Sequence, residues 1–249
     1  MDSHRANINV HTAAVWMIVE IFRNPELLAR VRAEVESINT DYTESTKWIE
    51  EVMGLPLLQS VYAEVLRLRV DVQTVFRSNH GDFNINEWRF PEKSLLLVPT
   101  RPAHRDTDYW NTRDGKYPLD RFWADRFLAF PDDAESGPAR PVSGAHNSKV
   151  KKNAANRSGG APKFVSAGTT DSWIPYGVGE RACPGRFFAR REISAFCAMM
   201  VRDYEVELPS LDAESHVPNN DVFYGLGVQR PRDRFAFRMR RRVSGVSGA

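Results

Sequence analysis

The sequence predicts a mainly α-helical protein that also contains small antiparallel β-sheets, and three observations support this fold class. Longer segments carry apolar residues at the three- and four-residue spacing that gives a helix a buried face. Shorter segments alternate apolar and polar residues and are bounded by Gly, Pro or Asn, which is typical of strands in hairpins. A glycine-rich turn at residues 173–185 leads into a further helix and carries Cys183.

The first expected helix covers residues 6–22, and its apolar side chains occupy nearly the whole circumference. A helix that is apolar on every side must be buried on every side. Because this helix begins soon after Met1, we expect much of what covers it to lie outside this chain. A second helix is expected from Pro25 to about Ile38, with Asn24 as its cap, since Pro suits the first helical position.

The middle of the chain is expected to alternate short helices and short strands, separated by turn residues such as those at 79–81. The apolar spacing decides which type each segment takes. The expected elements are helices at 57–68 and 104–110, strands at 70–78, 83–85 and 95–98, and an irregular aromatic segment at 120–130.

The last part of the chain begins with an expected surface insertion at residues 134–170. It is rich in Gly, Pro, Ser, Ala, Asn and Lys, and such a composition buries too little apolar surface to offset the entropy of ordering. We expect a flexible segment there, between a first part at 1–133 and a last part at 171–249. Strands are expected at 205–208 and 235–239, with a turn at 225–227 between them.

Composition excludes several classes of function. The chain has 249 residues, of which 42% are hydrophobic and 27% charged, as in an ordinary soluble globular protein. Its net charge of +2 predicts no nucleic-acid partner. No apolar run reaches the length of a membrane span, and no pair of Cys or His residues has zinc-site spacing. Cys183 and Cys197 could form at most one disulfide.

Cys183 stands where its thiol chemistry is most easily changed. Gly177 and Gly179 allow backbone conformations closed to other residues, and Pro184 suits the start of the helix that follows. The positive end of a helix dipole and nearby backbone N–H groups favour thiolate over thiol. A thiolate in a tight N–H-lined turn is what an axial ligand of haem iron requires. The plain alternative is a small apolar cysteine without chemistry.

The spacing around Cys183 closely resembles the haem-binding loop of the cytochrome P450 family. The residues that carry this resemblance are Tyr176, Gly177, Gly179, Arg181, Cys183 and Gly185. The resemblance implies that Cys183 is the iron ligand of haem b and that the loop residues hold the cofactor. One departure is Tyr176, where the family usually has Phe. Its ring can still pack on haem, but its hydroxyl needs a partner.

A second part of the resemblance concerns Glu64, Arg67 and Arg126. By itself, a Glu and an Arg three residues apart on a helix form an ordinary surface ion pair worth little. In cytochromes P450, a Glu-x-x-Arg helix pairs with a later arginine to brace the proximal side of the haem. The segment 122–127 resembles the motif of that arginine, with Ala124 in place of the usual Pro.

The resemblance also assigns residues near the cofactor edge and on the distal side. Arg181 and Arg77 occupy positions that bind haem propionates, although Arg77 could equally be a solvent-facing strand residue. His104 lies in a segment similar to the family's His-Arg-Asp stretch. The first helix resembles the long distal helix, in which Asn9 stands in place of the usual acid and Val10 in place of the alcohol of the proton relay. Asn9 is therefore the expected catalytic residue.

The likeness covers about residues 6–240 outside the insertion, and implies the C-terminal half of the cytochrome P450 fold, starting at the long distal helix. Val15-Trp16 and the Cys-Pro-Gly-Arg sequence resemble the sterol 7α-hydroxylase and prostacyclin synthase branch, including fungal relatives. The family implies a monooxygenase that inserts one oxygen atom from O2 into a small apolar, sterol- or lipid-like substrate. It also implies a NADPH-dependent reductase as electron donor.

Localisation and two rival functions complete the expectations. A full-length parent would lie on the cytoplasmic face of the endoplasmic reticulum membrane, attached through an N-terminal part that is missing here. The first rival is a haem-thiolate isomerase or dehydratase, which the altered acid–alcohol pair would suit. The second is a truncated, non-catalytic fragment, which the expected exposure of the first helix would suit.

Overall fold

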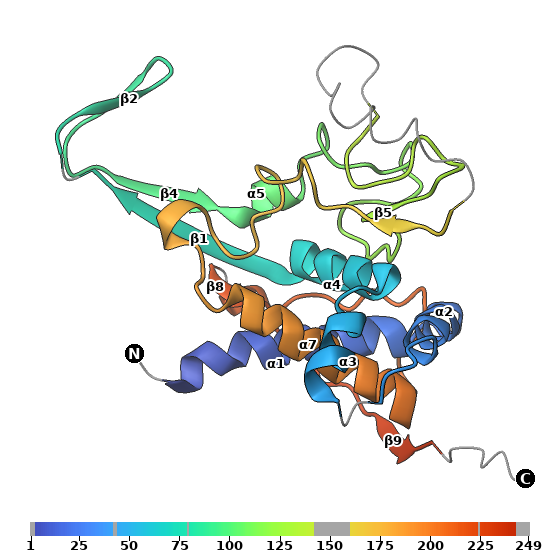
Figure 1. The fold of residues 1–249 in the computed structure, drawn as a ribbon. Helices are drawn as coiled ribbons and strands as arrows, with labels where there is room; N and C mark the ends of the chain where they lie inside the picture. Colours follow the sequence, from blue (N-terminus) through green and yellow to red (C-terminus); the bar gives the residue numbers. More distant parts are fainter. Residues whose placement is uncertain (1–2, 42–43, 79, 142–159, 224, 243–249) are drawn as a thin grey trace, which may run out of the picture.

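A computed structural model describes residues 3–41, 44–78, 80–141, 160–223 and 225–242, without the side chains of 3–7, 181 and 223. It contains a group of helices with strands β1, β2 and β4 on one side, while β9 lies beyond the opposite side of the helices (Figure 1). The helices are α1 (Ser3–Phe22), α2 (Pro25–Glu36), α3 (Ser45–Val52), α4 (Pro56–Arg69), α5 (Thr100–His104) and α7 (Arg186–Asp203), with 3-10 turns η1 (Gly179–Arg181) and η2 (Asp221–Phe223). The strands are β1 (Val70–Arg77), β2 (Phe83–Ile85), β3 (Trp88–Phe90), β4 (Leu95–Pro99), β5 (Leu128–Ala129), β6 (Lys163–Phe164), β7 (Tyr204–Glu207), β8 (Leu226–Val228) and β9 (Arg238–Arg241).

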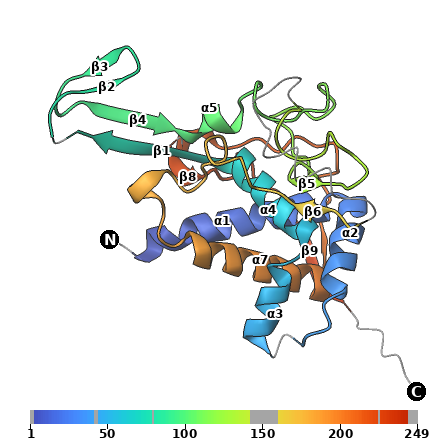
Figure 2. The ribbon, with the colours of Figure 1, turned by 45° about the horizontal axis from the view of Figure 1, so that its top comes forward.

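The main core lies between α1, α2, α4 and α7. Helices α1 and α7 run side by side in both views of the ribbon, and α4 packs across them (Figure 2). Helix α2 begins as predicted, because the side chain of Asn24 accepts the N–H of Leu27 and Pro25 is its first residue. The first turn of α4 is capped from α2, since the Glu34 carboxylate accepts the N–H groups of two of its residues.

Helix α1 is covered by its own chain more completely than the sequence suggested. Trp16, Met17 and Ile21 are fully buried, because α2, α4 and α7 pack around the carboxyl-terminal half of the helix. Only the side away from these helices stays open, where Val15 is 45% and Ile8 40% exposed. The expectation that much of the cover lies outside this chain is therefore wrong for the second half of α1.

A three-stranded antiparallel sheet, in the order β4-β1-β8, extends from the end of α4. Strand β1 begins where α4 ends, and its residues pair first with β8 and then with β4. The expected turn at 225–227 is thus partly wrong, because Leu226–Val228 form strand β8 and pair with the first residues of β1. The strand expected at 235–239 lies later, at Arg238–Arg241, where it pairs with β7.

Two further expectations need correction in the connecting segments. The helix expected at 104–110 lies earlier, as α5, and it ends at His104 because Arg67 binds the carbonyl oxygen there. The insertion expected at 134–170 is anchored at both described flanks. Ala139 forms a β-bridge with Trp110, and β6 pairs with β5, while residues 142–159 lie outside the described part.

None of the helices in the described part of the chain combines the length and the apolar character that a membrane span requires. The segment that leads into α7, the amino-terminal half of α1 and strands β1 and β8 all lie at the same end of the helical layer in both views (Figures 1 and 2). Cys183, Asn9 and Arg77 belong to these segments, whereas Glu64 and Arg67 lie on α4.

Candidate functional site

The loop that carries Cys183 is built from two tight turns. Gly177 and Gly179 have φ values of 76° and 60°, the left-handed region that glycine enters without steric cost. Between these turns and α7, the Cys183 N–H donates to the carbonyl oxygen of Tyr176 over 2.9 Å. Gly185 caps α7 and lies so close to the sulfur that a Cβ there would stand 3.9 Å from Sγ. The loop therefore holds Cys183 just before the amino end of an 18-residue helix.

The thiol of Cys183 is exposed, in contrast to that of Cys197. Cys197 is fully buried in the core, and burial raises the pKa of its thiol well above the usual range. Phe187 and Phe188, in the first turn of α7, are 68% and 71% exposed beside the cysteine loop. A free sulfur flanked by exposed aromatic rings can accept a flat apolar cofactor, and the buried Cys197 cannot.

The stem of the loop, residues 173–176, is tied to α4 and α5 by side-chain hydrogen bonds. The Trp173 indole donates to the carbonyl oxygen of Ala63 over 3.1 Å. The Ile174 N–H donates to His104 Nε2 over 3.1 Å. The hydroxyls of Tyr176 and Tyr62 share a hydrogen bond, so Tyr176 has the partner that its hydroxyl needs. Burial raises the pKa of both tyrosines, which keeps both hydroxyls protonated.

Glu64, Arg67 and Arg126 form one fully buried ion network beneath this stem. Arg67 Nε and Nη2 reach the Glu64 carboxylate over 2.7 and 2.9 Å, and Arg126 Nε reaches both of its oxygens over 3.0 Å. All three side chains are 0% exposed. Burial opposes the charge on Glu64, but Arg126 and Arg67 outweigh it and hold the pKa of Glu64 below its usual value. The predicted network is thus present in the geometry.

The two arginines of the network also organise the chain around them. Arg67 Nη1 donates to the carbonyl oxygen of His104 over 2.7 Å, and its Nη2 donates to that of Leu119 over 3.0 Å. Arg126 Nη1 donates to the carbonyl oxygen of Asn111 over 2.5 Å. Planar guanidinium groups can bind a carboxylate and carbonyl oxygens at once. One carboxylate on α4 therefore fixes segments that are far apart in the sequence.

Ser60 is a contributor that the sequence did not reveal. Its hydroxyl donates to the carbonyl oxygen of Ala124 over 2.5 Å and accepts the N–H of Phe127 over 3.1 Å. The turn at 123–127 is closed by the Arg126 N–H to the Trp123 carbonyl, over 3.1 Å. Ser60 thus holds the turn in which Ala124 replaces the usual Pro, and a serine one helical turn before Glu64 was the available signal.

His104 lies buried between the network and the stem of the cysteine loop, with 1% of its surface exposed. Burial, together with the nearby Arg67, lowers the pKa of its imidazole to about 3. The imidazole is therefore neutral, and its Nε2 accepts the Ile174 N–H. His104 links Arg67, through its own carbonyl oxygen, to the stem that leads to Cys183.

Asn9 lies on α1 with its side chain against strand β8. Its Oδ1 accepts the N–H of Val228 over 3.0 Å. Gly227, with φ of 133°, makes room for this contact, because a Cβ there would stand 2.3 Å from the same oxygen. The structure thus gives Asn9 a contact between helix α1 and strand β8, and its catalytic role stays a prediction.

The two expected propionate ligands differ in what the structure describes. Arg77 is exposed at the end of β1, opposite Leu95, and its guanidinium is available to an anion. Arg181 ends the 3-10 turn η1, but its side chain lies outside the described part of the chain. The side chains of Cys183, of the ion network and of Asn9, in contrast, all lie within the described part of the chain. The geometry brings the network and the stem of the loop into one connected assembly.

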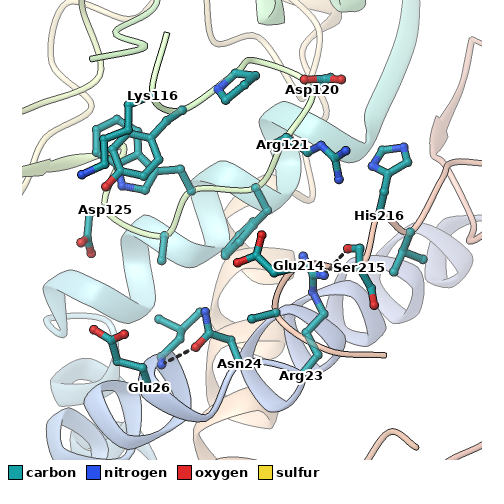
Figure 3. Close-up of a pocket in the computed structure, with 18 of the residues that line it drawn as sticks. Arg23, Asn24, Glu26, Lys116, Asp120, Arg121, Asp125, Glu214, Ser215 and His216 are labelled. Atoms are coloured by element: carbon teal, nitrogen blue, oxygen red, sulfur yellow. Dashed lines mark hydrogen bonds between the residues drawn. The ribbon is translucent and has the colours of Figure 1, made fainter. Parts of the chain in front are cut away.

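A separate cavity of about 630 Å³ lies away from the cysteine loop, between the start of α2, the 116–125 segment and the 213–217 segment (Figure 3). Its wall is polar, with residues of both signs such as Arg121 and Glu214. Arg23 points along this wall and is held by Glu20 at 2.6 Å and by backbone carbonyls. The cavity shares no lining residue with the cysteine loop.

Comparison with known proteins decides the family. The family model described as Cytochrome P450 matches residues 9–237 of this chain. The chain belongs to the cytochrome P450 family. Similar proteins include cytochrome P450 monooxygenase efuG of Hormonema carpetanum, 38% identical over 95% of this chain, and monooxygenase fsoE of Humicola fuscoatra, 36% identical over 95%. The chain spans 41% and 40% of these two relatives.

Solved structures show the same fold. A cytochrome P450 crystal structure titled CYP102L1 matches 94% of this chain with a TM-score of 0.61 and 21% identity, and the match covers 42% of that structure. The heme domain of a cytochrome P450DA mutant matches with a TM-score of 0.60. The chain therefore has the fold of about two fifths of a cytochrome P450, which confirms the fold class predicted from the sequence.

The residues present fit the haem that this family uses. Cys183 is exposed and forms no disulfide, so its sulfur is free to bind iron. The adjacent rings of Phe187 and Phe188 offer an apolar contact, and Arg77 offers a cation for a propionate. Within the described part of the chain, no group of His, Cys, Asp and Glu could hold a different metal ion.

Proposed function

We propose that this chain supplies the proximal side of a haem-thiolate monooxygenase, with Cys183 as the axial ligand of haem b. One observation carries the proposal: Cys183 presents an exposed sulfur before the amino end of α7, on a loop whose stem is anchored to α4. The amino end of a helix generally favours negative charge nearby, which suits an anionic ligand of iron. When bound, the haem supplies the activation of O2, which a thiolate ligand favours.

The other predicted site residues have supporting roles in the proposal. Gly177 and Gly179 allow the tight turns that bring the loop backbone toward the cofactor, and Gly185 precedes α7 beside the cysteine. The family resemblance assigns the ring of Tyr176 to packing on haem. Arg77 and Arg181 bind the haem propionates. Glu64, Arg67 and Arg126 hold the stem at a fixed place, since each is buried and fully paired.

The substrate and partners are inferred from the family and the relatives. The relatives named above are cytochrome P450 monooxygenases, which supports insertion of one oxygen atom into the substrate. The small apolar, sterol- or lipid-like character of that substrate is inferred from the family resemblance alone. A NADPH-dependent reductase supplies the electrons. The whole protein would act at the cytoplasmic face of the endoplasmic reticulum, attached through a part that precedes this segment.

A second candidate reaction is favoured by Asn9. The oxygen of this side chain already accepts the Val228 N–H, and the neighbouring Val10 has no hydroxyl. The acid and the alcohol of the relay are therefore missing from positions 9 and 10, although Thr12 follows on the same turn, with its hydroxyl bonded to the Ile8 carbonyl oxygen. A haem-thiolate isomerase or dehydratase, which rearranges an oxygenated lipid without O2, would not need that relay.

The experiment uses the chain of residues 1–249 with added haem. The reduced carbon monoxide complex is expected to show the red-shifted Soret band of thiolate ligation in the wild type and in Cys197→Ser, and to lose it in Cys183→Ser. Survival of that band in Cys183→Ser would contradict the proposal. Oxygen consumption that depends on NADPH and reductase, measured on the longer protein, separates the monooxygenase from the isomerase.

A further inference from the structure

Two side chains on one face of α4 hold the cysteine loop at both of its ends. Gln59 and Tyr62 are three residues apart on this helix, which makes them neighbours on its surface. Tyr62 shares its hydroxyl hydrogen bond with Tyr176, and the Gln59 side-chain oxygen accepts from the guanidinium of Arg190. Tyr176 lies seven residues before Cys183 and Arg190 seven residues after it.

Of these two contacts, the hydrogen bond at Tyr176 is coupled directly to Cys183. The carbonyl oxygen of Tyr176 accepts the N–H of Cys183 over 2.9 Å, so a displacement of Tyr176 moves the Cys183 backbone as well. Tyr62 is 2% exposed and sits two residues before Glu64 of the ion network, which fixes the helix that carries it. A buried phenol hydroxyl needs a partner, and Tyr62 and Tyr176 satisfy each other.

We propose that Tyr62 and Tyr176 are a positioning pair, whose shared hydroxyl hydrogen bond sets where the sulfur of Cys183 stands relative to α4. This proposal rests on the proposed function only where it assumes that the Cys183 sulfur binds iron. It explains why tyrosine occupies position 176: the hydroxyl adds a bond from the cysteine loop to the helix of the ion network, and a phenylalanine ring could not make this bond.

The experiment compares Tyr62→Phe, Tyr176→Phe and the double variant, which keep both rings and remove one or both hydroxyls. Amide hydrogen exchange of the apo chain is measured at Cys183 and, as an internal reference, at Val65 in the core of α4. Each single variant is expected to speed exchange at Cys183 roughly three- to tenfold, the scale of one hydrogen bond. The double variant is expected to match the singles, because all three lose the same bond.

Tyr109→Phe is the matched control. The Tyr109 hydroxyl donates to the carbonyl oxygen of Gly168 over 2.8 Å, outside the loop, so its loss is expected to leave exchange at Cys183 unchanged. Exchange at Cys183 that stays at the wild-type rate in both single variants, or that rises equally at Val65, would overturn the proposal. This arm needs no haem and therefore stands even if the proposed function fails.

A second readout addresses the sulfur itself. In the haem-loaded chain, the reduction potential is expected to shift from the wild-type value, by the same amount in both single variants and in the double variant. A purely structural role would speed exchange and leave the potential of the bound haem unchanged, and that outcome would contradict the positioning role.

Discussion

The stem and the tip of the cysteine loop are adjacent in sequence but are held in different ways. The stem, residues 173–176, is fixed by side chains of α4 and α5 that are themselves buried. The tip, residues 177–185, is held chiefly by backbone turns and exposes its thiol. The buried stem therefore sets position, while the open tip offers the ligand. A metal ligand can remain accessible because the rigidity comes from the segment beside it.

The same contrast distinguishes two ion pairs of nearly equal length. Arg67 and Glu64 meet at 2.7 Å with both side chains fully buried, whereas Arg89 and Asp82 meet at 2.6 Å on the β2–β3 hairpin with 74% and 42% exposure. The distance within each pair therefore does not predict how much its loss would cost. Burial does predict it, because a charge left without a partner in the core has no water to stabilise it.

The largest expected effect is that of Arg126→Ala, which breaks the support of the stem. It leaves the Glu64 carboxylate buried with one partner fewer and removes the anchor of the Asn111 carbonyl. Loss of one partner from a buried pair costs about 3–5 kcal/mol of unfolding free energy. Urea denaturation measures this loss of unfolding free energy. Arg89→Ala is the matched control and should lower the urea midpoint far less. Equal losses in the two variants would show that burial does not decide how much an ion pair stabilises the fold.

Lowering the pH tests the stem through His104. Its pKa is about 3 when folded and about 6.5 when unfolded, so the unfolded chain binds the extra proton as pH falls. Above pH 6.5 the buried neutral imidazole costs the folded chain no stability. Below pH 6.5 the unfolding free energy falls by about 1.4 kcal/mol per pH unit, which is about 2–3 kcal/mol by pH 4.5.

His104→Gln keeps an acceptor for the Ile174 N–H but does not titrate, so its unfolding free energy should be flatter between pH 6.5 and 4.5. The window stays above the range in which Glu64 takes up a proton, since the pKa of that group is lowered. His11→Gln, which changes an exposed histidine on α1, is the control and should retain the wild-type slope. Identical slopes for wild type and His104→Gln would refute the burial of a neutral His104.

A smaller loss of unfolding free energy is expected for Ser60→Ala. This variant disturbs the 123–127 turn, which supports the stem, and leaves the tip of the cysteine loop unchanged. The substitution leaves the buried N–H of Phe127 without its acceptor and the Ala124 carbonyl without a donor. An unsatisfied buried polar group costs about 1–3 kcal/mol. Thermal unfolding is the measurement, and Ser60→Thr, which keeps the hydroxyl, should recover part of the loss. A wild-type melting temperature for Ser60→Ala would contradict this role.

The smallest effect on stability is expected at the tip. Cys183 is exposed and its thiol bonds to none of the described side chains, so Cys183→Ser should change the unfolding free energy of the apo chain by less than about 0.5 kcal/mol. Cys197→Ser places a hydroxyl in the fully buried core and should destabilise more. The opposite order would mean that the exposed tip, rather than the core, stabilises the fold.

Local sequence signals were sufficient for the turns of the loop, whereas the buried network with Arg126 was predicted only through the family resemblance. The Gly177 and Gly179 turns, the start of α2 at Pro25 and the pairing of Glu64 with Arg67 all depend on near neighbours or on a specific motif. Strand β8 could not be predicted in this way. Gly225 precedes it and Gly227 is its middle residue, and these residues become a strand because β1 offers them a partner.

The contacts of Ser60, Tyr62 and His104 were also beyond the sequence. Each is an ordinary residue of its segment, and its role appears only when α4 is packed against the 123–127 turn or the cysteine loop. The cover on α1 is similar. The all-round apolar pattern indicated burial but not which elements provide it, and α2, α4 and α7 of the same chain cover much of the helix.

X-ray absorption at the iron edge tests the central claim most directly, because it reports the atoms bound to iron. The haem-loaded chain and Cys197→Ser are expected to show a sulfur neighbour of the iron, and Cys183→Ser is expected to show none. A sulfur neighbour that persists in Cys183→Ser, or that is absent from the haem-loaded wild type, would contradict the assignment of Cys183 as the ligand.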